Sequence, residues 1–231
     1  MPKIKKIVGA VLLAAVGSAH AGAPLLSEDA GVLAAGECEI ELIAALARES
    51  GASERERAVG LACGAGHDWQ WGVALAHAAA ERGSARGLLL GGKITLWTSG
   101  EDRSIVLAPS LSWADDGSGW KHVAQDVNLV YSGPLAPDWK LHLNLGHGRD
   151  REGDERSTHG SMALEHAGFE VGGILLAPMG DLAGDDRGAP WWNLGLRLTL
   201  AADRAWLGLS YARQIDPQRA RLVTLSFKYA F

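Results

Sequence analysis

The residues best suited to acid–base chemistry are concentrated between positions 142 and 166. His142 and Glu165 would face each other if the segments 138–149 and 158–167 were neighbouring strands joined by a turn near residues 153–154. An imidazole beside a carboxylate is a common acid–base pair. Ser161 lies in the same stretch, and a serine near such a pair would make an outer-membrane lipid hydrolase an alternative function.

The same spacing argues against catalysis. Ser161 is expected beside Gly146 rather than beside a histidine, and the sequence motif of those hydrolases is missing. The chain also carries no glycine-rich phosphate loop and no zinc-binding pattern. We therefore predict a protein that is not an enzyme and that has no catalytic residue, no cofactor and no metal site. In this interpretation His142 and Glu165 form an ion pair inside a pore.

Cys38 and Cys63 are the only two cysteines. With a turn at residues 50–53, antiparallel pairing brings the two cysteines opposite each other, and both share the parity of the apolar residues on their segments. A protein exported to an oxidising compartment forms disulfides readily. We predict a cross-strand Cys38–Cys63 disulfide, with two unpaired thiols as the alternative.

The first 21 residues have the features of a secretory signal peptide. Lys3, Lys5 and Lys6 precede an apolar run, and small residues precede Gly22. The apolar run is near ten residues, which is shorter than the roughly 20 that a membrane helix needs. Cleavage would remove the three lysines and change the net charge from −5 to −8, so a partnership with nucleic acid is not expected.

The C-terminal segment alternates with a period of two residues, which is typical of a strand with one apolar face. A terminal aromatic residue on such a strand resembles the signal that the barrel-assembly machinery of the outer membrane recognises. We predict that this machinery and the outer-membrane lipid are partners of the protein. The predicted assembly signal consists of Val223, Leu225, Phe227, Tyr229 and Phe231.

The same alternation recurs along the mature chain and predicts about twelve strands. Their ranges are 37–49, 55–65, 69–79, 86–98, 103–114, 120–132, 138–149, 158–167, 169–179, 190–200, 205–213 and 220–231.

The number of strands indicates whether the apolar face of the barrel points inward or outward. About eight strands already give an interior that side chains can fill, so a barrel of twelve has too wide an interior for a solid apolar core. The apolar face should point to lipid and the polar face to the lumen. A soluble periplasmic binding barrel is the alternative. The predicted lumen-lining residues are Glu39, Glu41, Lys93, Asp126, Asn128, His142, Asn144, Glu165, Arg197 and Lys228.

The links between the predicted strands also fit a membrane barrel. Short links at 66–68, 99–102, 133–138 and 201–204 carry turn residues. They alternate with other links, and two of these, 149–157 and 180–189, are longer and charged, as expected for short periplasmic turns and longer extracellular loops. Several tryptophans lie at predicted strand ends, where aromatic girdles meet the membrane interface.

Several stretches of the chain resemble a proteobacterial family of outer-membrane barrels that are often labelled as meta-pathway phenol-degradation proteins. The resemblance begins with residues 24–31 followed by 36–42, and continues, in the same order as in the family, through 68–75, 141–146 and 193–197. The resemblance implies an outer-membrane β-barrel with a transport role and carries over no catalytic residue. It matches least well over residues 85–115.

The prediction is an all-β transmembrane antiparallel barrel. We expect a signal peptide at 1–21, a periplasmic N-terminal segment at 22–36 and the barrel at 37–231. The expected function is a narrow channel or transporter for small solutes, with apolar or aromatic solutes among the candidates. A structural or surface-interaction barrel with a plugged lumen is the main alternative.

Overall fold

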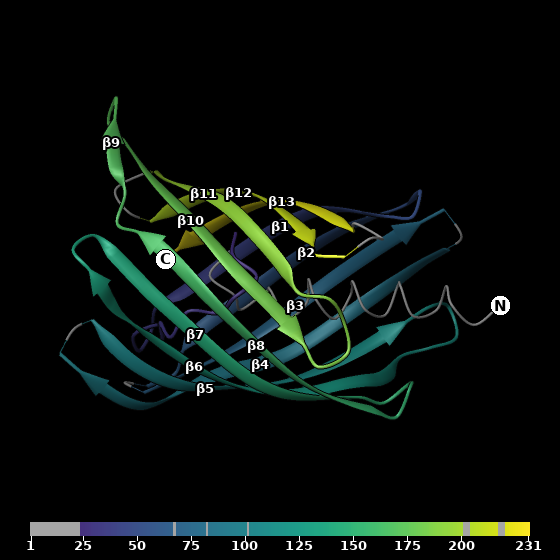
Figure 1. Ribbon diagram of the computed structural model, residues 1–231. Helices are drawn as coiled ribbons and strands as arrows, with labels where there is room; N and C mark the ends of the chain where they lie inside the picture. The colour runs from purple at the N-terminus through teal and green to yellow at the C-terminus, as the bar shows by residue number, and fades with distance from the viewer. Residues whose placement is uncertain (1–23, 67, 82, 101, 201–203, 217–219) are drawn as a thin grey trace.

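The computed structural model describes residues 24–231 apart from 67, 82, 101, 201–203 and 217–219. The predicted signal peptide lies outside the described residues. The described chain forms a β-barrel (Figure 1). Its strands are β1 (Cys38–Glu49), β2 (Ala52–Gly64), β3 (Trp69–Ala80), β4 (Gly83–Ser99), β5 (Arg103–Asp115), β6 (Lys121–Ala136), β7 (Trp139–Asp150), β8 (Glu155–His166), β9 (Phe169–Val171), β10 (Ile174–Asp185), β11 (Trp191–Leu200), β12 (Ala205–Gln214) and β13 (Arg221–Ala230).

Twelve long strands close into a ring in which every neighbour is antiparallel. Strand β10 pairs with both β8 and β11, and β13 pairs with β1 to complete the circle. The pairing of β1 with β13 extends to the last residue of the sequence. Cys38 N–H donates to the Phe231 carbonyl, and Phe231 N–H donates to the Cys38 carbonyl. Closure satisfies the backbone polar groups that an open sheet edge would expose. The predicted fold class is confirmed.

The short strand β9 is not part of the ring. It pairs only with the beginning of β10, across a turn at Gly172 and Gly173 that both have positive φ. The resulting hairpin extends beyond the barrel wall (Figure 1). The prediction of a strand over 169–179 is therefore wrong at both ends, since the barrel strand runs from Ile174 to Asp185. The inward Asp181 and the small residues around it interrupt the apolar alternation on which the prediction depended.

The two long charged links are shorter than expected, because the neighbouring strands continue into them. Strand β7 ends at Asp150 and β8 begins at Glu155, so the turn occupies only residues 151–154. Likewise, β10 and β11 leave only residues 186–190 between them. Polar side chains near the barrel rim are compatible with extended backbone, and polarity alone therefore gave the wrong strand ends.

Side chains alternate between an apolar outer face and a small or polar inner face. Large outward residues are exposed, and Leu145 and Leu194 are 62% and 64% exposed. The inner face of β1 to β4 instead packs small residues such as Ala74, Ala76 and Ala78. This polarity is the reverse of that expected for a soluble barrel, because soluble proteins rarely expose a large apolar patch.

Tryptophans mark both ends of the barrel. Trp69, Trp139 and Trp206 lie at the end of the barrel where β1 begins and β13 ends, and Trp120 and Trp191 lie at the opposite end. Indole rings favour the membrane interface, where an apolar body and an N–H donor are both accommodated. Among the described residues, no helix is long and apolar enough to span a membrane.

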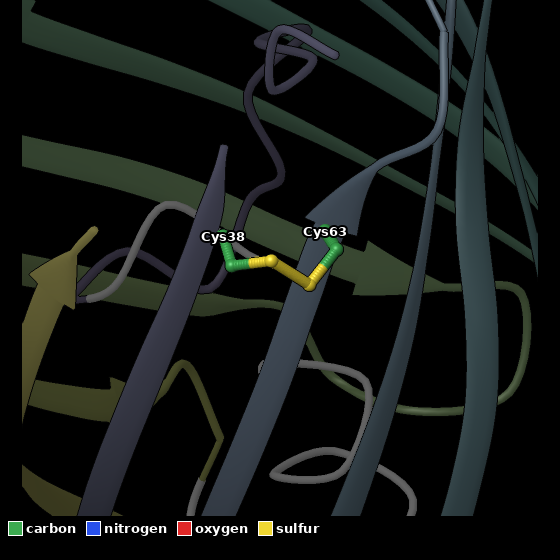
Figure 2. Close-up of a disulfide and its surroundings, with 2 residues drawn as sticks. All are labelled: Cys38 and Cys63. Atoms are coloured by element: carbon green, nitrogen blue, oxygen red, sulfur yellow. A yellow bond between two sulfur atoms is a disulfide. The ribbon is translucent and has the colours of Figure 1, made fainter. Parts of the chain in front are cut away.

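The predicted disulfide is confirmed. Cys38 and Cys63 occupy directly opposed positions of β1 and β2 and are joined by an S–S bond (Figure 2). The bond closes a loop with a sequence separation of 25 residues, for which the chain-entropy model gives a stabilisation of about 3 kcal/mol. It fixes the first barrel strand to its neighbour at the point where the N-terminal segment joins the wall.

The assignment of the outer face to lipid can be tested by introducing a charge on it. We expect Leu145→Arg to lower the free energy of unfolding of the barrel in vesicles by about 2–4 kcal/mol, because an arginine on the lipid face must be desolvated. Val171→Arg is the matched control, since Val171 is 54% exposed on the β9 hairpin beyond the wall. The measurement is urea unfolding followed by gel mobility of unheated samples. Equal stability of the two variants would contradict the lipid-facing assignment.

Candidate functional site

The N-terminal segment preceding β1 lies inside the barrel. Residues 24–34 are shown in purple among the strands in Figure 1, and Leu25, Ser27 and Ala30 are each at most 3% exposed. This path differs from the periplasmic segment predicted at 22–36, of which residues 22 and 23 lie outside the described structure. Hydrophobic periodicity gives no indication of the internal path. We call residues 24–34 the internal segment.

Strands β10 and β11 hold the beginning of the internal segment. The Asn193 side chain donates to the Pro24 carbonyl at 3.1 Å. One oxygen of Asp181 accepts three hydrogen bonds, from the Leu26 N–H at 2.6 Å, the Ser27 N–H at 2.9 Å and the Ser27 hydroxyl at 3.1 Å. Hydrogen bonds to a charged acceptor are the stronger kind, so Asp181 is the main anchor of this end.

Strands β6 and β7 hold the middle of the internal segment. Asn144 accepts from the Glu28 N–H and donates to the Glu28 carbonyl, both at 3.0 Å. The Asn128 amide donates to the Glu28 carboxylate at 2.9 Å. Asn128 and Asn144 also bond to each other at 2.9 Å, so the two predicted lumen-lining amides form one clamp around a single residue of the segment.

The remaining contacts lead the internal segment towards β3. The Lys93 ammonium donates to the Asp29 carbonyl at 2.8 Å and lies 3.4 Å from the Asp29 carboxylate. The Ala30 N–H donates to the Ser132 hydroxyl. The Leu33 N–H donates to the Gln70 side chain at 2.8 Å. Side chains from both sides of the lumen therefore contact the internal segment.

Glycines in the wall provide space for this path. A Cβ at Gly64 would lie 2.1 Å from the Ala34 carbonyl oxygen, and a Cβ at Gly195 would lie 2.9 Å from the Pro24 ring. Real Cβ atoms do not approach other heavy atoms so closely, so larger residues here would displace the segment. These glycines are required by close backbone approach rather than by a turn.

Apolar contacts between the internal segment and the wall are few. Leu25 packs against Ala163, Ala177 and Met179, and Ala30 packs against Val106 and Val130. The segment is thus held mainly by hydrogen bonds to polar side chains. A polar contact can be exchanged for water or solute at low net cost, because the net stabilisation by a typical hydrogen bond is about 1 kcal/mol.

Several predicted lumen-lining residues form ion pairs on the inner wall, between neighbouring strands or across one intervening strand. Lys228 donates to Glu39 at 3.1 Å. Arg197 pairs with Glu165, and the same carboxylate lies 3.4 Å from His142 Nε2. Such pairs hold charge within the wall rather than leaving it free to contact solute.

The structure also brings Asp126 near His159, a residue outside the predicted lumen-lining set. Their closest atoms, Asp126 Oδ2 and His159 Nδ1, are 3.7 Å apart. The histidine ring lies over Gly146, where a Cβ would be 2.0 Å from its Nε2 atom. A small residue opposite His159 therefore makes this contact possible.

The predicted register between β7 and β8 is wrong by two residues. His142 lies directly opposite Ala163, Glu165 lies opposite Lys140, and Ser161 lies opposite Asn144. The turn between the strands is centred closer to β7 than expected, and this moves every pair. His142 still reaches Glu165 diagonally, as long side chains on one face of a sheet can.

No hydrolase geometry forms around Ser161 in the described structure. The serine near His142 is instead Ser132, whose Oγ shares a hydrogen bond of 2.7 Å with His142 Nδ1. Ser132 is 1% exposed, and its hydroxyl also accepts the Ala30 N–H. The Ser132 hydroxyl is therefore enclosed, and it already forms a hydrogen bond with the internal segment. The network of Ala30, Ser132 and His142 connects the segment to the wall.

Three inward carboxylates have no hydrogen-bond partner in the described structure. Glu41 projects from β1, and Glu54 and Glu56 project from β2. Together with Glu39, Asp126, Glu165 and Asp181, the inward carboxylates outnumber the inward cations Lys93, Arg197 and Lys228. The lumen therefore has an acidic excess.

Sequence reasoning missed several inward residues that contact the internal segment. Each occupies an inward position of its strand, but a single serine, amide or carboxylate on a polar face carries no motif. Only the parity of the strand could have indicated them, and the partner segment could not be inferred. They are Gln70, Ser104, Ser132, Asp181 and Asn193.

The predicted assembly signal lies on the outer face of β13. Val223, Leu225 and Tyr229 are exposed there, and Phe231 lies directly after the strand. Recognition of these residues by the assembly machinery stays a prediction.

Comparisons with known proteins identify the fold. No family model and no curated protein matches the chain. An outer membrane channel from Pseudomonas putida F1 is 10% identical with a TM-score of 0.58, covering 88% of this chain and 97% of that one. The KdgM porin is 9% identical with a TM-score of 0.53, covering 83% and 99%. The β domain of the Bordetella autotransporter BrkA is 14% identical with a TM-score of 0.54, covering 84% and 99%.

These similarities define the fold of the protein as a β-barrel of the kind found in outer-membrane proteins. At such low identity they establish the fold alone, and the fold serves both channels and autotransporter domains. Membership of the meta-pathway family stays a prediction.

The anchoring of the internal segment can be measured by thiol labelling. Ser27→Cys places a thiol on the segment while Cys38 and Cys63 remain paired. We expect Asp181→Ala in this background to increase maleimide labelling of the folded barrel by roughly tenfold or more, because loss of a single charged hydrogen bond is worth about 1.5–3 kcal/mol. Asp116→Ala, in an exposed loop, is the control and should leave the rate unchanged. Equal rates in all three proteins would contradict the anchoring role.

Proposed function

We propose that the protein is an outer-membrane channel whose pathway is occupied by its own N-terminal segment and opens when that segment is displaced. The observation that carries the proposal is the type of contact: residues 24–34 are held across the lumen mainly by hydrogen bonds to wall side chains. An apolar plug would resist replacement by water, whereas these polar contacts can be exchanged. The channel fold of several structural neighbours supports this function.

The junction between the internal segment and the wall favours a tethered movement. Ala35 forms a bridge with Gly64, and Gly36 N–H donates to the Gly64 carbonyl. The Cys38–Cys63 bond follows directly and holds the start of β1. A segment released from the lumen would therefore remain attached beside the pore and could return.

The acidic excess of the lumen indicates the solute class. Charged rings within a pore select permeating ions of the opposite sign, and Glu41, Glu54 and Glu56 have no cationic partner within hydrogen-bond distance in the described structure. We therefore propose small cationic solutes in place of the apolar or aromatic ones considered from the sequence, because the described inner wall offers polar rather than aromatic contacts. The lipid surroundings, export through the signal peptide and recognition by the assembly machinery belong to the same proposal.

Planar-bilayer conductance tests the occupied pathway. We expect deletion of residues 22–34 from the mature protein to give larger and more frequent stepwise currents than the intact barrel gives. The complementary variant Ser27→Cys/Asp181→Cys, whose side chains contact each other in the native protein, should lock the segment and suppress currents until reductant is added.

Controls separate channel function from loss of structure. Reductant on the unmodified protein controls for opening of Cys38–Cys63, and a shift in gel mobility on boiling shows that each variant is folded. Folded, silent barrels in both the deleted and the intact protein would contradict the channel and favour a structural or surface-interaction barrel.

Cation preference is tested by the reversal potential in a salt gradient. In the segment-deleted barrel, we expect Glu41→Gln, Glu54→Gln and Glu56→Gln together to move the reversal potential towards zero, because the substitutions remove carboxylates from the pathway. Glu152→Gln, in the exposed turn after β7, should have no comparable effect. An unchanged reversal potential in the triple variant would exclude these three residues as the selectivity determinants.

A further inference from the structure

Outward-facing basic residues form two cross-strand rows towards the end of the barrel that is opposite Cys38 and Phe231. In the first row, Arg221 of β13 lies directly opposite both Arg48 of β1 and Arg213 of β12. In the second row, His77 of β3 lies directly opposite both Arg57 of β2 and Arg86 of β4. We call these six residues, on six consecutive strands of the wall, the basic belt.

The basic belt borders the apolar outer surface. Along each strand, the next outward residue towards the end that carries Cys38 and Phe231 is apolar or aromatic: Leu46 precedes Arg48, and Tyr211 precedes Arg213. The same step leads from Arg221 to Val223 and from Arg57 to Val59. Each row therefore lies where the apolar outward residues of its own strands end. The first row, in which Arg48 lies opposite Ser53 close to the β1–β2 turn, is placed where the headgroups of one membrane leaflet would contact the wall.

The first row lacks compensating charge within the described structure. Like charges directly opposite each other on neighbouring strands are destabilising, yet Arg48, Arg213 and Arg221 form no ion pair or hydrogen bond with a described side chain. No acidic residue occupies an outward position beside them on β12, β13 or β1. An external anion would remove this repulsion.

The rim on the opposite side of the barrel is different. There Arg149 donates to Asp154 and Arg187 donates to Glu155. The Arg149 guanidinium holds the pKa of the Asp154 carboxyl below its ordinary value through hydrogen bonding and charge attraction. Within the belt itself, Arg86 donates to Asp115 at 2.7 Å, so the uncompensated arginines are those of the first row. This contrast indicates that the first row is adapted to a ligand outside the chain.

We propose that the basic belt is a binding site for the phosphate groups of the glycolipid of the outer leaflet, with Arg48, Arg213 and Arg221 as its centre. Guanidinium groups bind phosphate oxygens in a bidentate manner. Neighbouring strands are about 4.8 Å apart, so three arginines in a row can engage a headgroup that carries more than one phosphate. A glycerophospholipid presents a single phosphate and matches the row less well.

The site lies on the outer wall and does not depend on the channel proposal. It involves none of the residues that contact the internal segment. A barrel that conducts no current could still bind lipid there, and a barrel that binds no lipid there could still conduct.

The test measures lipid retention by the intact barrel. Protein reconstituted in phosphatidylcholine vesicles doped with lipid A is extracted in mild detergent, and bound lipid is counted by native mass spectrometry. We expect Arg48→Gln/Arg213→Gln/Arg221→Gln to retain lipid A much more weakly, by about fivefold for each arginine removed. The charge-preserving variant with lysine at the three positions should retain an intermediate amount.

A matched control removes the same charge from the other rim. Arg149→Gln/Arg156→Gln/Arg187→Gln should retain as much lipid A as the unmodified protein, and a gel-mobility shift on boiling shows that each barrel is folded. Vesicles doped with dephosphorylated lipid A should abolish the difference between the variants. Equal loss in both triple variants, or equal retention of phosphatidylglycerol and lipid A, would overturn the proposal. If the triple glutamine variant does not fold, the triple lysine variant provides the test. The proposal would be overturned if that variant retained every lipid as well as the unmodified protein does.

Discussion

Every strand of this protein depends on the pairing of β13 with β1. In a lipid environment an unpaired backbone N–H or C=O costs several kcal/mol, so a sheet of this length is stable only as a closed ring. The last residue of the chain contributes to closure, since Phe231 exchanges two backbone hydrogen bonds with Cys38. The disulfide fixes the same corner from the side of β2, and the internal segment enters the lumen beside it. The hydrogen bonds that close the barrel, the disulfide and the entry of the internal segment therefore all lie where β13, β1 and β2 meet.

A ring of this width leaves an interior that wall side chains do not fill by themselves. The barrel fills this space with residues 24–34 of its own chain, whose backbone N–H and C=O groups need hydrogen-bond partners. An inner wall rich in amides, hydroxyls and carboxylates provides these partners. Glycines at 64 and 195 give this backbone room to approach. Polar wall and polar segment are therefore complementary, and neither would be well satisfied in a dry lumen without the other.

The fold could be predicted from the sequence because apolar residues recur at every second position wherever one face of a strand contacts lipid. The strand ending in Phe231 shows it most clearly, and the pairing of Cys38 with Cys63 follows from the position of a turn. Prediction was less accurate where the inner face dominates. The small residues around Asp181 concealed the second half of β10, and a turn misplaced by one position shifted the partners of His142 and Ser161. The path of residues 24–34 could not be predicted, because hydrogen bonds between one irregular segment and side chains from many strands leave no periodic signal.

The attachment of residues 24–34 at Gly64 and Cys38 makes the internal segment an intramolecular ligand of the lumen. A short tether gives such a ligand an effective concentration of roughly millimolar, whatever the concentration of the protein itself. In the channel that we propose, an entering solute would compete with this constant occupant, and its apparent affinity would fall in proportion to the fraction of time that the lumen is free. The few residues between the segment and β1 would then set a threshold of solute concentration below which the barrel stays filled by its own chain.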